Sequence, residues 1–590
     1  MTLFFFNQGR IEKPNVYNTL HILHIMKISK LIITVILLFS AISIVYSIAD
    51  ANKPATFSGS FDNKFNRYSQ YQTHNALNEL QLMADKWCDT VWKNDRAHSQ
   101  LVLWIENSHQ NTKCEISYEI GDLKSNVGVI QSSNINVRFP QYIIGDSTAT
   151  ECNKHHENRE QVYIADALSE QTSSSLSKKD PLKLWITVDI PKDTPQGRYE
   201  GKITIKDKSG YKKDFFIDLL VAGKTLPDVK DWTFHLDIWQ FPFQLSTICA
   251  KNGDPVEPFS DDYMNLMRPF YKILADGGQK VVTTYIKDGA FRPDQTMVNW
   301  TRLADNTWHF GYTNFDRYVE FMFDLGIDKQ ISCFSPGGWD KSIGYREVGS
   351  SERKVKFLEV GSPDYNNTWT IFLKSFREHL NEKGWFDKVV LYLDEVPDAV
   401  TKKIIKMIRD NGSDWKIGIA GSRHSAEVEA EFYDYSVFLG YDKKVESNPI
   451  STFYTSCSHP APNNYVSKET SPSEMVWMAW YAKSQNYNGY LRWAFDYWMN
   501  EDPTNVQDGG NTAGDCNMIY RSDNSKNSQA IASIRFAMLR EGIQDFEKIK
   551  ILNNEELNKF VSEIKFEPGT NYNELIGTAQ SLLKRVSINE

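Results

Sequence analysis

The stretch Val389-Val-Leu-Tyr-Leu-Asp394-Glu395-Val-Pro397-Asp398 determines how the rest of the chain is interpreted. A short continuous apolar run is typical of a strand buried on both faces. Pro397 lacks an N–H for a sheet hydrogen bond, so the strand should end at Asp394 and Glu395. Because α/β folds build their sites at the carboxyl ends of strands, the two carboxylates are catalytic candidates. The plainer interpretation is that Asp394 and Glu395 are only the polar start of a loop or helix. The rest of the sequence must decide between these two interpretations.

Outward from this strand, residues 231–524 alternate predicted strands with amphipathic helices. The expected strands are 232–239, 280–286, 330–334, 389–394, 416–420, 435–439, 451–454 and 489–495, and the expected helices are 263–275, 315–325, 369–380, 400–408 and 474–485. Ser471 to Glu474 has the pattern of a capping box before the last helix. This alternation predicts a TIM-like (β/α)8 barrel of the α/β class, although the connection between the sixth and seventh strands is too short for a full helix.

Two further regions flank the predicted barrel. Short apolar or alternating runs separated by turn sequences predict a β-sandwich over residues 55–225, with one helix at Asn75–Trp87. Residues 525–590 have apolar side chains at helical spacing, which predicts a helical segment packed on the outside of the barrel. A chain of 590 residues is too long for a single core, in agreement with a multi-domain protein.

The N-terminal residues have the pattern of a targeting segment. Lys27 and Lys30 precede an apolar run from residue 31 to 46, and Ser47-Ile48-Ala49 supplies the small residues of a cleavage site. We expect a signal peptide over residues 1–49, with Met26 as the better start and residues 1–25 as an upstream misreading of the gene. The alternative is an uncleaved membrane anchor, for which the run of roughly 16 residues is slightly short. Either way the protein is expected to be exported, to the periplasm or the exterior.

Composition and cysteine spacing exclude several classes of protein. A net charge of -9 argues against a nucleic-acid partner, which would normally meet a basic face. Aromatic residues at 13% provide flat rings of the kind that sugar-binding clefts use. Seven cysteines lack the Cys-x-x-Cys spacing of zinc and redox motifs, and export would allow a bridge such as Cys88–Cys114. No metal or cofactor is expected, since Asp394, Glu395 and Asp398 do not provide the six or more oxygens of a hard-cation site.

Other predicted strand ends carry polar and aromatic residues that would meet Asp394 and Glu395 on the same face of a barrel. The candidate substrate contacts are Asp237, Trp239, Tyr285, Tyr392, Tyr454, Arg492, Trp493, Asp496 and Trp498. Some of these rings must belong to the core. Trp493, Asp496 and Trp498 are preferred, because they lie where the last strand gives way to a loop.

Adjacent carboxylates differ from the usual glycosidase arrangement, in which two acids from different strands lie about 5–5.5 Å apart or farther. Neighbouring strand residues also point to opposite faces, so Asp394 and Glu395 can serve one substrate only if the backbone turns at the strand end. Such a pair suits substrate-assisted hydrolysis, in which the acetamido carbonyl of an N-acetylhexosamine attacks its own anomeric carbon. One carboxylate then stabilises the oxazolinium and the other protonates the leaving oxygen.

Several motifs together resemble glycoside hydrolase family 123. They are Tyr392–Glu395, Leu491–Trp498 with Asp502-Pro503, Arg540–Glu547, and the sandwich segments Val188–Asp193 and Gly197–Gly201. The resemblance covers nearly the whole mature chain and implies a β-N-acetylgalactosaminidase with a β-sandwich ahead of a (β/α)8 barrel. It also implies that Asp394 stabilises the acetamido group, that Glu395 is the general acid/base, and that the partner is a glycan or glycolipid.

Two other hypotheses stay open at this stage. The chain could be an ordinary two-carboxylate glycosidase, with Glu395 paired to an acid such as Asp237 or Asp496. It could also be a carbohydrate-binding barrel without turnover.

Overall fold

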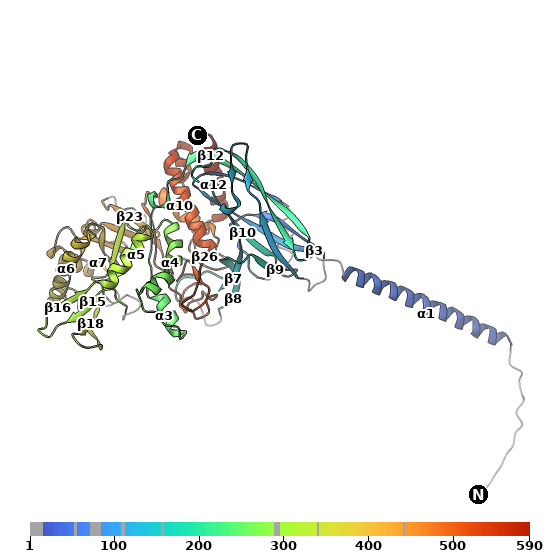
Figure 1. Cartoon of the computed structure of the whole chain (residues 1–590), viewed down its shortest axis with the longest axis horizontal. Helices are drawn as coiled ribbons and strands as arrows, with labels where there is room; N and C mark the ends of the chain where they lie inside the picture. Colours follow the sequence, from blue (N-terminus) through green and yellow to red (C-terminus); the bar gives the residue numbers. More distant parts are fainter. Residues whose placement is uncertain are drawn as a thin grey trace, which may run out of the picture.

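The computed structural model describes residues 16–51, 56–70, 84–107, 113–154, 159–287, 295–338, 341–440, 444 and 447–589. Its body consists of a β-sandwich, a (β/α)8 barrel and C-terminal helices at the junction of the two (Figure 1). An N-terminal helix lies outside this body, on the side of the sandwich away from the barrel. The predicted order of sandwich, barrel and helical segment is confirmed.

The sandwich is built from two sheets with the strand orders β1-β3-β10-β7-β8-β26-β25 and β2-β12-β11-β4-β9, and β5 and β6 extend the second. Strands β25 (Tyr520–Arg521) and β26 (Ala530–Ser533) come from the C-terminal part of the chain. Inward side chains such as Leu101, Ile186 and Phe215 are completely buried between the sheets. The strands are β1 (Thr56–Asp62), β2 (Lys86–Lys93), β3 (Arg96–Asn107), β4 (Lys113–Ile120), β5 (Leu123–Lys124), β6 (Val129–Ile130), β7 (Ile135–Asp146), β8 (Gln161–Ser169), β9 (Ser173–Ser177), β10 (Leu182–Asp189), β11 (Gly197–Asp207) and β12 (Lys212–Thr225), with a 3-10 turn at Ser132–Asn134.

Two predictions for the sandwich need correction. Most of the helix expected over Asn75–Trp87 lies outside the described residues, but its end does not, and Lys86 and Trp87 belong to β2, where Trp87 pairs with Ile217. The expected bridge between Cys88 and Cys114 is absent, and both thiols are free. Cys88 lies on β2 and Cys114 on β4, and two other strands lie between these two. At about 4.8 Å from one strand to the next, β2 and β4 are roughly 14 Å apart, which is far beyond the reach of a disulfide.

The barrel contains eight parallel strands in the order β13-β24-β23-β22-β21-β20-β17-β14. The bridge between Leu236 and Gln279 brings β13 back to the start of β14 and nearly closes the sheet. All eight expected strands are present, as β13 (His235–Ile238), β14 (Val281–Tyr285), β17 (Gln330–Phe334), β20 (Val389–Asp394), β21 (Lys416–Gly421), β22 (Asp434–Phe438), β23 (Ile450–Thr455) and β24 (Gly489–Arg492). The first and last are shorter than predicted.

Most of the helices on the outside of the barrel pack against it through one apolar stripe, whereas α9 is buried over nearly its whole length. On α6, for example, Trp369, Phe372 and Phe376 are buried, as their spacing predicts. The helices are α3 (Gln244–Lys251), α4 (Asp261–Asp276), α5 (Thr313–Asp324), α6 (Pro363–Lys383), α7 (Asp398–Asp410), α8 (Ala426–Glu429) and α9 (Ser473–Ser484), with 3-10 turns at Val229–Asp231 and Phe386–Lys388. Half of the predicted capping box of α9 forms, since the Ser471 N–H donates to Glu474 Oε1 at 2.8 Å. The Ser471 hydroxyl accepts from the Ser473 N–H at 3.2 Å rather than from the Glu474 N–H.

A four-stranded sheet, absent from the sequence prediction, grows out of two barrel connections. Its order is β16-β15-β18-β19, from β15 (Asn299–Arg302), β16 (Trp308–Gly311), β18 (Ser342–Glu347) and β19 (Arg353–Phe357). The first two strands follow β14 and the other two follow β17. The sheet is anchored to α6 by Trp300, whose ring stacks on Phe372 with centroids 4.7 Å apart.

The C-terminal segment joins the barrel to the sandwich. Its elements are β25 (Tyr520–Arg521), β26 (Ala530–Ser533), α10 (Ile534–Leu552), α11 (Glu555–Ser562) and α12 (Tyr572–Asn589). Residues 530–533 were expected to be helical but form β26, which pairs with β8 of the sandwich. On α10, Phe546 packs against Phe234 of the barrel and the buried Arg535 binds Asp166 of the sandwich at 2.8 Å. The two larger units therefore share one interface.

Helix α1 (Val16–Ala51) stands apart from this body (Figure 1). Its segment Leu23–Ile42 has a mean hydropathy of 2.2, and none of it is buried against the rest of the protein. By length and composition it can cross a membrane or act as a signal sequence, and both expectations for the N-terminus stay predictions.

Candidate active site

The end of β20 changes direction at Glu395. Val389 to Leu393 are buried, Asp394 is half-buried and Glu395 is exposed. The Glu395 N–H still bonds to the Ala420 carbonyl at 2.8 Å, but its φ of 49° is in the left-handed region. Because neighbours on a regular strand point to opposite faces, this turn is what allows Asp394 and Glu395 to line the same cavity. A left-handed non-glycine residue is strained, and such strain is concentrated at functional sites.

The cavity has a volume of about 350 Å3, within the range of small-molecule sites. The barrel strands and their ends contribute Trp239, Asp394, Glu395, Ala420, Tyr454, Leu491 and Trp493, and surrounding loops contribute Cys152, Ser456, Cys457, Ser458, Asn511 and Asp515. Three acidic residues, Asp394, Glu395 and Asp515, and two tryptophans thus line one space. Cys152 belongs to the sandwich, so both large units form the wall.

Tyr454, at the end of β23, is a hydrogen-bond partner of Glu395. Its hydroxyl donates to Glu395 Oε1 at 3.0 Å. Burial, together with the charges of Glu395 and Asp394, raises the pKa of Tyr454 above its ordinary value, so the phenol stays a neutral donor. The bond holds the carboxylate of Glu395 in a defined orientation although the residue is exposed.

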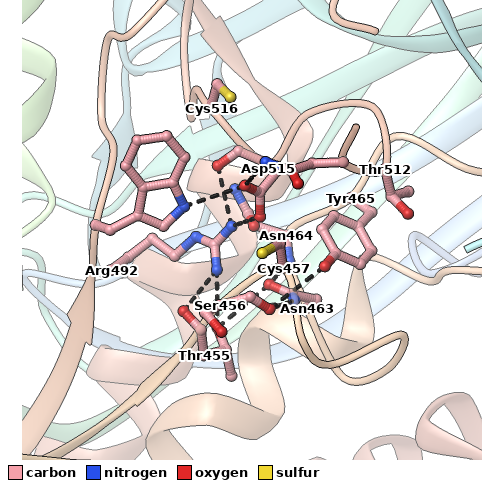
Figure 2. A network of polar contacts seen from close by, with 12 residues as sticks. Thr455, Ser456, Cys457, Asn463, Asn464, Tyr465, Arg492, Thr512, Asp515 and Cys516 are labelled. Carbon is pink, nitrogen blue, oxygen red and sulfur yellow. Dashed lines mark hydrogen bonds and ion pairs between the residues drawn. The ribbon is translucent and has the colours of Figure 1, made fainter. Parts of the chain in front are cut away.

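A second set of polar contacts surrounds Asp515 (Figure 2). Its Oδ1 is paired with the fully buried guanidinium of Arg492, which also donates to the Thr455 carbonyl at 2.6 Å. Its Oδ2 accepts from Trp493 Nε1 at 3.2 Å and from Asn511 Nδ2 at 3.1 Å. Asp515 therefore fixes the indole of Trp493 and the amide of Asn511 at the cavity wall.

Comparison with known proteins identifies the family. The model of the glycoside hydrolase 123 catalytic domain matches residues 239–552, more than half of the chain. The chain belongs to glycoside hydrolase family 123. The model of the glycoside hydrolase 123 N-terminal domain matches residues 64–207. The protein is therefore a glycoside hydrolase, and the resemblance seen in the sequence is confirmed.

Solved structures support the fold of this glycoside hydrolase. A family 123 glycoside hydrolase from Clostridium perfringens, described in a study of glycolipid glycan hydrolysis, has a TM-score of 0.79 and 22% identity and covers 90% of this chain and 98% of its own. A GH5 xyloglucanase from Bacteroides ovatus, with 8% identity and coverage of 82% and 100%, has a TM-score of only 0.27 and supports no conclusion. The comparison with curated protein sequences returned no match.

The glycoside hydrolase brings together part of the residue set expected from sequence. Asp394, Glu395, Trp239, Tyr454 and Trp493 all line the cavity. They come from four barrel strands or strand ends, as the barrel prediction required. Their roles toward a sugar stay predictions.

Asp237 and Tyr392 lie instead inside the barrel. Tyr392 is fully buried and Asp237 is 1% exposed. Burial, reinforced by the charge of Asp434, raises the pKa of Asp237 well above its usual range. Each shares the inner face of its strand with a cavity residue two positions further on, Trp239 or Asp394, but lies one layer deeper in the barrel, so neither lines the cavity. The expected direct contacts of Asp237 and Tyr392 with substrate are therefore not supported.

Four further candidates also lie in packed surroundings. The Tyr285 hydroxyl donates to the Gln240 carbonyl at 3.0 Å, and Trp498 Nε1 donates to the Ile519 carbonyl at 2.9 Å. Asp496 accepts from the Phe241 N–H at 2.8 Å and from the Tyr271 hydroxyl at 2.9 Å. Arg492, the buried partner of Asp515, is behind the cavity wall. None of the four lines the cavity: Asp496 and Trp498 lie in the buried segment beyond Trp493, and the polar groups of Tyr285 and Arg492 are engaged within the packed interior.

Sequence reasoning missed Asn511, Asp515 and the disulfide Cys152–Cys457, in which 305 residues separate the two cysteines. They come from loops without periodicity, so no local pattern indicates them. The one signal available was Arg492, because a buried arginine requires an acidic partner. That signal does not say which of the many acids in the chain is the partner.

One group among the described residues brings potential metal ligands together, namely Asp508, Asp515 and Cys516, whose ligand atoms lie within 4.8 Å of one another. Both oxygens of Asp515 are already engaged by Arg492, Trp493 and Asn511. Burial and the charge of Asp508 raise the pKa of the Cys516 thiol, which donates to Asp508. The group is a hydrogen-bonded network that does not favour a cation.

Proposed function

We propose that this glycoside hydrolase removes β-linked N-acetylgalactosamine from glycans or glycolipids by substrate-assisted hydrolysis with retention of configuration. The observation that carries the proposal is the left-handed turn at Glu395, which directs two adjacent carboxylates into one cavity. An enzyme with its own nucleophile needs two acids on opposite sides of the anomeric carbon, normally from different strands. An adjacent pair instead suits a substrate that supplies its own nucleophile.

In the proposed mechanism, Asp394 accepts a hydrogen bond from the acetamido N–H and stabilises the positive charge of the oxazolinium. Glu395 protonates the glycosidic oxygen and later removes a proton from the water that opens the intermediate. The Tyr454 hydroxyl, bonded to Glu395 Oε1, orients the carboxylate through both steps. Trp239 and Trp493 provide apolar ring surfaces for the sugar.

Three observations support the wider setting of the proposal. The similar hydrolase from Clostridium perfringens was studied for glycolipid glycan hydrolysis, which favours a glycan or glycolipid substrate here. The apolar segment Leu23–Ile42 and the disulfide Cys152–Cys457 favour export, since disulfides persist in oxidising compartments. The protein is thus proposed to act in the periplasm or outside the cell, either released or anchored by α1.

The two alternatives have less support. Asp237 and Asp496, named above as possible partners of Glu395 in an ordinary retaining mechanism, are buried and do not line the cavity. Asp515 does line it, but both of its oxygens are engaged by Arg492, Trp493 and Asn511. A binding protein without turnover would have no need for the strained backbone at Glu395.

A paired assay with the purified protein tests the proposal. A chromogenic β-N-acetylgalactosaminide should be cleaved, whereas the matching β-galactoside, which lacks the acetamido group, should not. Asp394→Ala serves as the matched inactive variant. Equal cleavage of both substrates would support the two-carboxylate mechanism, and cleavage of neither would support a binding role.

A further inference from the structure

The tip of the β7–β8 hairpin of the sandwich reaches the wall of the cavity. Cys152 is bonded to Cys457, and both residues line the cavity. The Cys152 N–H donates to the Cys457 carbonyl at 2.8 Å. Thr150 and Thr512 exchange two hydrogen bonds, one from the Thr150 N–H at 3.0 Å and one to the Thr150 carbonyl at 2.9 Å. The hairpin is thus attached to two barrel loops, those that carry Cys457 and Thr512.

An ion pair at the base of this hairpin holds the second loop. Asp146, at the end of β7, and Arg159, just before β8, form a bidentate pair whose side chains are 2% and 14% exposed. Arg159 also donates to the Asp508 and Asn511 carbonyls. Asp146 in turn accepts from the Ala513 N–H and from Gln507 Nε2, each at 2.7 Å. All four of these hydrogen bonds join the ion pair to residues 507–513.

This loop leads directly to residues that face the cavity. Asn511 lies in it, and Asp515 comes just after it and binds the indole N–H of Trp493. A continuous set of contacts therefore runs from the sandwich, through Arg159 and the loop, to Trp493. We infer that Arg159, Asp146 and the Cys152–Cys457 disulfide are positioning elements of the active site, through which the sandwich sets the place of the sugar platform. The inference rests on the proposed function only for the identity of the sugar.

Variants at Arg159 test this role against a merely structural one. Arg159→Ala and Arg159→Lys both lose the planar fork that binds Asp146 and the two carbonyls together. Because Trp493 and Asn511 would contact the sugar before and during the reaction alike, KM should rise on the order of tenfold while kcat changes little. Arg96→Ala is the matched control, since Arg96 also links the sandwich to the barrel but does not line the cavity. It pairs with Asp189 of its own sheet and with Asp276 at the end of α4. It should lower the melting temperature without changing KM.

The disulfide supplies a second test that needs no change at Arg159. A dithiol reductant transfers two electrons and two protons to the Cys152–Cys457 bond, which gives two thiols while the dithiol becomes a cyclic disulfide. The other five cysteines are already free, so reduction changes this one bond. KM of the wild type should rise on reduction, to the value of the double variant Cys152→Ser, Cys457→Ser. The double variant itself should not respond to the dithiol.

Hydrogen exchange gives a readout that does not depend on the substrate. The Ala513 and Thr150 amides should exchange faster in Arg159→Ala than in Arg96→Ala, whether or not the protein cleaves an N-acetylgalactosaminide. Absence of wild-type turnover would refute the proposed function alone. Unchanged exchange, or an Arg159 variant whose KM matches that of Arg96→Ala, would overturn the positioning role.

Discussion

The ends of β20 and β24 belong to the same barrel, yet their polar residues have different environments. At β20, both Asp394 and Glu395 reach the cavity, whereas among the predicted contacts after β24 only Trp493 does. The difference arises from the path of the chain beyond each strand. Glu395 turns into the left-handed region and stays exposed, but residues 495–497 are covered by a returning loop, in which the Met518 N–H bonds to the Phe495 carbonyl at 2.8 Å. A strand end is therefore a site only where the next segment leaves it open.

The largest effect is expected at the open strand end. Glu395→Gln should lower turnover by ~10²–10⁴-fold on substrates with poor leaving groups, because it removes general acid catalysis. Substrates whose leaving group needs no protonation should lose much less. The measurement is kcat/KM on a pair of N-acetylgalactosaminides that differ only in the leaving group. Equal losses on both would argue against Glu395 as the acid.

Two tryptophans that follow β24 have different environments: Trp493 faces the cavity and Trp498 lies in the core. Trp498→Ala should lower the free energy of unfolding by about 3–5 kcal/mol and leave KM unchanged, because this ring is packed against Phe270. Trp493→Ala should instead raise KM, since its ring is half-buried and faces the cavity. Thermal unfolding and Michaelis kinetics of both variants provide the check. A large stability loss with unchanged KM for Trp493→Ala would move that ring into the core as well.

Asp496 should reveal its structural role through pH. Burial raises its pKa to about 6 from an ordinary value of 3.8. The stability that comes from its protonated form is therefore fully present below about pH 4 and is lost as pH rises through about 6. At about 1.4 kcal/mol for each pH unit, the loss is about 3 kcal/mol. Unfolding measured across this window should show a flatter profile for Asp496→Asn, whose KM should not change. A changed KM would restore Asp496 as a sugar contact.

The parts of the fold that could be predicted are those with a local cause. Strands buried on both faces leave apolar runs in the sequence, which is why β20 was found with both of its ends correct. The sheet formed by β15, β16, β18 and β19 was missed because short exposed strands depend on their partners rather than on their own sequence. The same holds for β26, whose helical spacing was overruled by pairing with β8.

The same distinction between local causes and distant partners applies to the candidate site. Asp394 and Glu395 stand next to each other at a strand end, and Pro397 indicates the turn. The other wall of the cavity comes from Cys152, Asn511 and Asp515, which folding brings together from loops more than 300 residues apart. No periodicity connects such positions. Burial of Asp496 and Trp498 was equally hidden, because it depends on a loop that returns from residue 518.

The most direct test of substrate assistance combines one variant with two probes. Asp394→Asn should retain the fold but lose turnover, because the interaction it removes strengthens in the transition state. A thiazoline analogue of the bicyclic intermediate should inhibit the wild type and bind Asp394→Asn more weakly. A fluorosugar should form no covalent adduct with the wild type. A fluorosugar trapped on any carboxylate of a wild-type enzyme that ignores the thiazoline would contradict substrate assistance.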